Sequence, residues 1–80
     1  MTATAYVLVS VQGGKAQGVY QKLVGLKGVV HVDVVFGPYD MIVLVQGADS
    51  MAIGRLVLET ISQVEGISDT ITCNVIPVEQ

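Results

Sequence analysis

Two spacings of hydrophobic residues alternate along this chain of 80 residues. Four segments are rich in valine and isoleucine and are apolar either continuously or at every second position, which is typical of β-strands. They are residues 5–11, 29–36, 41–46 and 67–76. Two further segments, 16–24 and 50–64, place apolar side chains three or four positions apart, which is typical of helices. Glycines follow both helical segments, and Asp49 or Ser50 is suited to cap the second helix.

The resulting order is strand–helix–strand–strand–helix–strand. It predicts one α+β domain over residues 1–80, a ferredoxin-like βαββαβ fold with a four-stranded antiparallel sheet. An internal repeat supports this order, because LKGVVHVDV matches VEGISDTIT at a spacing of 38 residues, with Gly28 aligned on Gly66. Segments 5–11 and 41–46 are the most uniformly apolar, so we expect them to be the central strands. Polar residues in the other two strands indicate sheet edges.

Alternation within the strands predicts which side chains face the helices. We expect the helix-facing set in the central strands to be Val7, Val9, Val11, Met41, Val43 and Val45, and the opposite set to be Tyr6, Leu8, Ile42 and Leu44. In the second strand we expect one side to hold Val30, Val32, Val34 and Phe36, and the other to hold His31, Asp33 and Val35. Because the helices cover only one face, the other remains apolar and bare. A second copy packed sheet to sheet then gives a closed dimer, a dimeric α+β barrel.

Composition strengthens the expectation of self-association. The chain is 51% hydrophobic and only 14% charged, against roughly 25% charged residues in soluble domains. Its single cysteine excludes an internal disulfide, and a domain this small commonly needs extra stabilisation from partner subunits. The four basic residues are scattered, which argues against direct nucleic-acid binding. With no signal-peptide pattern and no apolar run of about 18 residues, we expect a cytoplasmic protein without membrane contact.

Few side chains suggest catalysis. His31 and Asp33 share a strand face, yet one imidazole and one carboxylate do not complete a metal site, so a polar pair on an edge strand is favoured. Cys73 alternates with apolar residues and is expected to be a small buried hydrophobe rather than a nucleophile. We therefore expect no metal, no cofactor and no enzymatic activity.

The stretch Gly37-Pro38-Tyr39-Asp40 lies between the second and third strands. Pro38 suits a turn, but a tight hairpin would prefer Asn-Gly or Asp-Gly, and the turn does not require Tyr39 or Asp40. Asp40 could pair with an ammonium group, and backbone N–H groups near Gly37 could receive a carboxylate. A plain turn and a ligand-binding loop both remain open on these residues alone.

Gly37-x-Tyr39-Asp40 followed by Gly66-Ile67-x-x-Thr70-x-Thr72 resembles a signature of the Lrp/AsnC, or feast/famine, transcription regulators. The similarity covers their effector-binding (RAM) domain, from about Ala5 to Val78. Members usually carry an N-terminal helix-turn-helix domain, so this chain resembles the stand-alone form. The resemblance implies ligand contacts from Gly37, Tyr39, Asp40, Thr70 and Thr72, with Pro38 at a variable position.

The same resemblance implies a sheet-to-sheet dimer and a ring of four or five dimers, an octamer or decamer, that binds an amino acid between dimers. Full-length Lrp/AsnC regulators are further implied partners. Two alternatives share the topology. One is a small dimeric α+β barrel enzyme of the monooxygenase or isomerase type, for which only His31, Asp33 and Tyr6 could supply a base or ligands. The other is an ACT-like regulatory domain, which lacks the paired motifs.

Overall fold

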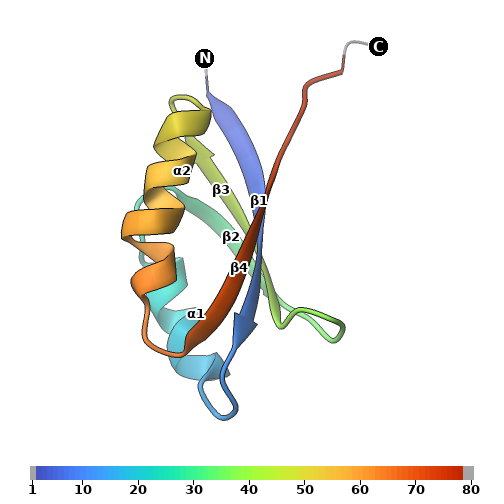
Figure 1. The fold of residues 1–80 in the computed structure, drawn as a ribbon, viewed down its shortest axis with the longest axis vertical. Helices are drawn as coiled ribbons and strands as arrows, with labels where there is room; N and C mark the ends of the chain where they lie inside the picture. The colour runs from blue at the N-terminus through green and yellow to red at the C-terminus, as the bar shows by residue number, and fades with distance from the viewer. Residues whose placement is uncertain (1, 79–80) are drawn as a thin grey trace.

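The computed structural model describes residues 2–78 and has two helices packed on one side of a four-stranded sheet (Figure 1). The elements, in chain order, are β1 (Ala3–Val11), α1 (Ala16–Val24), β2 (Val29–Val34), β3 (Met41–Gly47), α2 (Ser50–Glu59), the short 3-10 helix η1 (Ile61–Gln63) and β4 (Ile67–Asn74). This order confirms the predicted ferredoxin-like βαββαβ arrangement. The end of the segment 50–64, which was expected to be helical throughout, contains the separate 3-10 helix η1.

The strands follow the spatial order β2-β3-β1-β4, and every neighbouring pair is antiparallel. The two most apolar strands, β1 and β3, therefore lie in the centre, as the sequence predicts. Val7 lies opposite Val43 on one side and opposite Thr72 on the other. The polar residues of β2 and β4 lie at the edges, where backbone groups and side chains can be hydrated.

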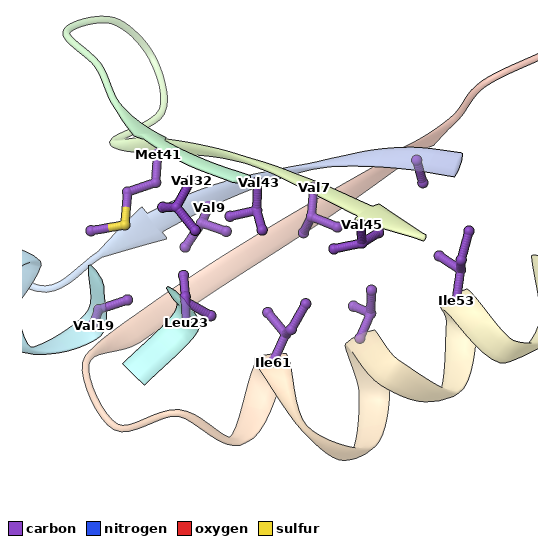
Figure 2. Packing of buried hydrophobic residues seen from close by; sticks show 12 residues of the cluster. Val7, Val9, Val19, Leu23, Val32, Met41, Val43, Val45, Ile53 and Ile61 are labelled. Carbon is purple, nitrogen blue, oxygen red and sulfur yellow. The ribbon is translucent and has the colours of Figure 1, made fainter. Parts of the chain in front are cut away.

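Small aliphatic side chains fill the space between the sheet and the helices (Figure 2). The buried hydrophobic residues are Ala5, Val7, Val9, Val19, Leu23, Val32, Met41, Val43, Val45, Ile53, Val57 and Ile61. The predicted helix-facing set of the central strands is thus confirmed, except that Val11 is only half-buried, where the pairing of β1 with β4 shifts register. The opposite face, which we call the open face, carries Tyr6, Leu8, Ile42 and Leu44 as predicted and is covered by neither helix (Figure 1).

The two halves of the chain repeat one helix-to-strand turn. Gly28 and Gly66, aligned in the sequence repeat, have φ angles of +95° and +101°, which L side chains rarely adopt. Each glycine carbonyl accepts a hydrogen bond from a glutamine N–H: Gly28 from Gln46 in β3 at 2.9 Å, and Gly66 from Gln12, the residue directly after β1, at 2.7 Å. The sequence repeat therefore marks a shared backbone conformation that fastens each turn to the sheet.

The prediction for the second strand is partly wrong. A register shift between Val29 and His31 places Val29 opposite Val45, so Val29, and not Val30, shares a side with Val32. Val30 is exposed as a result. The strand also ends at Val34, which leaves Phe36 fully exposed in the loop rather than on the sheet. When a strand contains one extra residue, the side chains that come before the irregularity point to the opposite face from the one that simple alternation predicts.

The expectation for Cys73 is also wrong. Cys73 lies opposite Tyr6 on the open face and is exposed, because no element of the described chain covers that side. At the second helix, Asp49 is the cap, and its Oδ1 accepts a hydrogen bond from the Ala52 N–H at 2.8 Å. Within residues 2–78, neither helix is long and apolar enough to cross a membrane.

Candidate functional site

The loop between β2 and β3 is a projecting hairpin tied to the central strand β1. The Asp40 N–H donates to the Val9 carbonyl at 2.9 Å, and the Asp40 carbonyl accepts from the Val35 N–H at 2.9 Å. Gly37 has a φ of +152°, and a Cβ built on it would meet no atom within 4 Å. Glycine is therefore favoured at this position by backbone conformation rather than by lack of space.

Asp40 also fixes the loop through its side chain. Its Oδ2 accepts a hydrogen bond from the Val11 N–H at 2.8 Å in a partly buried setting. This bond satisfies a backbone donor at the end of β1, next to the register shift between Ser10 and Val11. Asp40 thus has a structural use in the turn, which the sequence interpretation did not give it.

The hairpin and the open face together form an apolar pocket, which we call the hairpin pocket. Leu8 and Ile42 contribute from the sheet, and Phe36, Pro38 and Tyr39 contribute from the loop. Its volume is about 450 Å³. Gly37 and Tyr39, two of the expected ligand contacts, both line this pocket.

Thr70 and Thr72 lie elsewhere, on the helix side of the edge strand β4. They are opposite Val9 and Val7, whose side chains are buried beneath the helices. Here a groove of about 340 Å³ runs between α2 and β4, and we call it the α2–β4 groove. Its lining includes Ser50, Ile53, Gly54, Val57, Leu58, Thr70, Thr72 and Asn74. The Thr70 hydroxyl is 3.5 Å from that of Ser62, a long contact that leaves it available to another partner.

A single chain therefore does not bring the five expected contacts together. Gly37, Tyr39 and Asp40 gather at the hairpin, but Thr70 and Thr72 open on the other side of the sheet. The groove also includes Ser50 and Asn74, which the motif did not single out. The alternation of β4 places Asn74 beside the threonines, so strand periodicity could have found it, whereas Ser50 depends on how α2 lies over the sheet.

The candidate acid–base residues do not form a cluster. His31 Nε2 and Asp33 Oδ1 are 3.0 Å apart, and both side chains are more than half exposed. His31 lies opposite Leu44, which in turn lies opposite Tyr6, so two strand spacings of about 4.8 Å separate His31 from Tyr6. Among the described residues, no group of three or more His, Cys, Asp or Glu side chains could hold a metal ion.

Comparison with known families decides what this fold and these motifs represent. The family model of the Lrp/AsnC ligand binding domain matches residues 4–77. The chain belongs to the Lrp/AsnC family. A curated relative, an uncharacterized HTH-type transcriptional regulator of Pyrococcus furiosus, is 28% identical over 72 residues. The match covers 86% of this chain but 48% of the relative, so the chain spans about half the length of that protein.

Solved structures agree with the family assignment. The crystal structure of FFRP-DM1 superposes with a TM-score of 0.88 at 31% identity, covering 92% of this chain and 99% of the other. A transcriptional regulator of Neisseria meningitidis, solved as an L-Met complex, has a TM-score of 0.84 at 19% identity. That match covers 94% of this Lrp/AsnC chain and 50% of the Neisseria protein, and it shows a shared fold.

Proposed function

We propose that this Lrp/AsnC chain is a single regulatory domain over residues 1–80 that binds an amino acid or a related small molecule, and that it is not an enzyme. The ligand binds between neighbouring dimers of a ring, an octamer or decamer. The chain also joins full-length Lrp/AsnC regulators through their matching domains and thereby modulates transcription in the cytoplasm without touching nucleic acid. Membership of a family of transcription regulators supports the regulatory role.

The α2–β4 groove is the observation that carries the proposal. Its volume of about 340 Å³ is within the range of small-molecule sites. Ile53 and Val57 give it an apolar floor, and the hydroxyls of Thr70 and Thr72 give it donors and acceptors. None of the described residues that line it is charged. A zwitterion bound there therefore needs charged or strongly polar partners from another part of the assembly.

The hairpin of a subunit in the neighbouring dimer is suited to supply those partners. Backbone N–H groups near Gly37 receive the ligand carboxylate, and Tyr39 packs against the ligand. Asp40 accepts a hydrogen bond from the ligand ammonium through Oδ1, since Oδ2 is already bound to the Val11 N–H. The two halves of the site lie on different faces of one chain, which favours a site shared between subunits.

The open face supports the dimer that such a ring requires. Tyr6 is exposed there, and Leu8, Ile42 and Leu44 are only half-buried in the single chain. A contiguous apolar face of this kind marks an interaction surface. A second copy packed sheet to sheet covers it with the same residues, which gives a closed two-fold dimer. A ligand that bridges dimers then stabilises the larger assembly by mass action.

A thermal-shift screen over the amino acids, with light scattering on the same samples, tests the proposal. L-Methionine belongs in the screen because the Neisseria regulator of the same fold is in complex with it. A ligand at 100 times its Kd stabilises the protein by about 2.7 kcal/mol, which corresponds to a Tm rise of roughly 10–20 °C for a domain of this size. If no amino acid shifts the Tm at millimolar concentration, the chain is not an amino-acid sensor.

Three variants locate the site. Asp40→Asn keeps an oxygen for the Val11 N–H but removes the charge that pairs with an ammonium, and Thr72→Val removes a groove hydroxyl without changing the side-chain shape. Both are expected to reduce the ligand-induced Tm shift. Thr2→Val, at an exposed position before β1, is the matched control and should leave the shift unchanged. Equal shifts in all three variants would place the ligand elsewhere.

A further inference from the structure

Two projecting segments bound the open face at opposite ends. The hairpin between β2 and β3 projects at one end of the sheet, and residues 76–78, which we call the arm, project at the other end (Figure 1). Both lean toward the side of the sheet that faces away from α1 and α2 (Figure 1). The face proposed above as the dimer interface is therefore flanked by an arm at one end and a loop at the other.

The arm is apolar and runs past the end of the strand beside it in its own chain. The Val75 N–H donates to the Thr4 carbonyl at 2.9 Å, and β1 begins only one residue earlier, at Ala3. By the same register Ala3 lies level with Ile76, and β1 offers no residue beside Pro77 or Val78. Ile76 and Val78 are 79% and 75% exposed, and Pro77 between them lacks an N–H. An aliphatic segment held this far from its own core gains free energy if another surface covers it.

The hairpin pocket is a suitable surface for such a segment. Its lining is almost entirely apolar, with Leu8 and Ile42 from the sheet and the fully exposed Phe36 from the loop. Its volume of about 450 Å³ is large enough for a small ligand or several aliphatic side chains. In a single chain the arm and the pocket lie at opposite ends of β1 (Figure 1). The arm of a chain is therefore poorly placed to fill its own pocket.

Symmetry brings an arm and a pocket together in pairs. In a dimer of two stacked sheets, a two-fold axis can lie between the sheets and run across the strands. Rotation about this axis places the arm end of one copy over the hairpin end of the other. The contact then occurs twice, as an isologous interface requires. Charge distribution fits this arrangement, because β1 and β3 carry no charged residue, while His31, Asp33 and Asp69 lie on the edge strands. A charge-free centre and a polar rim are typical of interfaces.

The size of the open face also favours a role for the two projections. Four strands about 4.8 Å apart, with nine residues in the longest at about 3.3 Å each, give a flat area of roughly 550 Å². Stable interfaces bury about 800 Å² per partner. The arm and the hairpin extend the possible contact area beyond this flat outline (Figure 1).

We propose that, in the sheet-to-sheet dimer of the proposed function, the arm of each chain packs into the hairpin pocket of its partner. Ile76 and Val78 contact Phe36 and the pocket floor of the partner's chain from the side of the sheet. The loop that carries Gly37 and Tyr39 is thereby held by the partner, so the conformation of a ligand-binding loop depends on dimerisation. The groove of a neighbouring dimer approaches the same loop from outside.

Cross-linking between two differently labelled chains tests the contact directly. One chain carries Cys73→Ser with Ile76→Cys, and the other carries Cys73→Ser with Pro38→Cys, so each has a single thiol. The two are mixed, allowed to exchange subunits and treated with a short bismaleimide. The expected result is a mixed covalent dimer whose linked peptides join residues 76 and 38. Met51→Cys replaces Ile76→Cys in the control, because Met51 is similarly exposed, at 69%, but lies on α2.

Equilibrium sedimentation measures what the contact contributes. Ile76→Ser is expected to raise the dimer Kd about 10-fold or more, whereas Met51→Ser on α2, also strongly exposed and outside the α2–β4 groove, should change it less than about 2-fold. Three outcomes would each overturn the inference. They are equal cross-linking through Met51→Cys, a dimer that does not form the 76–38 link, and a chain that remains monomeric at every concentration measured. Amino-acid thermal shifts are a separate result. If the 76–38 link forms but no amino acid shifts the Tm, the arm contact is supported and the proposal of amino-acid binding is rejected.

Discussion

The turn at Gly66 gives the sharpest test of how this fold is held together, through the substitution Gly66→Ala. Gly66 is buried and has a φ of +101°. A Cβ placed there would lie 2.8 Å from Lys15 Cβ and 2.9 Å from Val19 Cγ2. Contacts of that length force atoms to move, and both neighbours belong to the start of α1, where Val19 is part of the core. The substitution therefore disturbs the backbone and the packing of α1 together.

The two effects have separate magnitudes. Holding an L side chain in a left-handed conformation costs roughly 1–2 kcal/mol, and overpacking a filled site typically costs about 1–3 kcal/mol. Gly66→Ala should thus lower the free energy of unfolding by about 2–5 kcal/mol. Gly28→Ala should cost less, because its Cβ would meet mainly the end of the Leu56 side chain, at 3.0 Å, which can move. At about 4–8 °C per kcal/mol, Gly66→Ala should lower the Tm by at least about 8 °C.

Urea unfolding at one fixed protein concentration, followed by far-UV circular dichroism, measures these differences. Gly18→Ala is the matched control, since Gly18 lies inside α1 and a Cβ on it would meet nothing within 4 Å. That change should stabilise the protein by roughly 0.5–1 kcal/mol, because alanine is the better helix former. A Gly66→Ala protein as stable as Gly18→Ala would refute the reasoning about the turn.

Three further outcomes are expected. Asp40→Ala leaves the partly buried Val11 N–H without its acceptor and should lower the free energy of unfolding by about 1–3 kcal/mol, whereas Asp40→Asn, which keeps an oxygen, should cost clearly less; urea titrations of both variants check this. Asp49→Ala removes the cap of α2 and should cost about 1 kcal/mol, seen as a fall of roughly 4–8 °C in a thermal melt, while the neighbouring Ser50→Ala serves as the control. Cys73 lies on the open face, so its rate of reaction with a thiol reagent should fall as the protein concentration rises; a rate independent of concentration would contradict dimerisation through that face.

The sequence predicted the architecture because the hydrophobic pattern and the glycine repeat specify the same arrangement. The alternation in β1 and β3 identified the buried valines correctly except for Val11, since β1 and β3 pair with each other in a regular register and the β1–β4 pairing is irregular only at Val11. It failed in β2, where a register shift beside Val29 exposes Val30. It also failed for Cys73, because alternation states which residues share a face but not whether that face is covered within one chain.

The candidate site was predictable as motifs but not as a geometry. Short sequence motifs identified the hairpin residues and the two threonines as candidates. That the hairpin and the threonines lie on opposite sides of the sheet follows from strand pairing across the whole fold. The structural use of Asp40 was also hidden, because its partner, the Val11 N–H, is 29 residues away in the chain. Long-range backbone contacts of this kind leave no local pattern.

The core is built without aromatic side chains, and this has a practical consequence for spectroscopy. The chain has no tryptophan, and Tyr6, Tyr20, Phe36 and Tyr39 all lie outside the buried cluster. Tyr6 is on the open face, and Phe36 and Tyr39 are at the hairpin. Tyrosine fluorescence and near-ultraviolet dichroism will therefore respond chiefly to what covers these outer surfaces, while the far-ultraviolet signal follows the backbone. Assembly and folding can accordingly be observed in two separate optical channels, without adding a label.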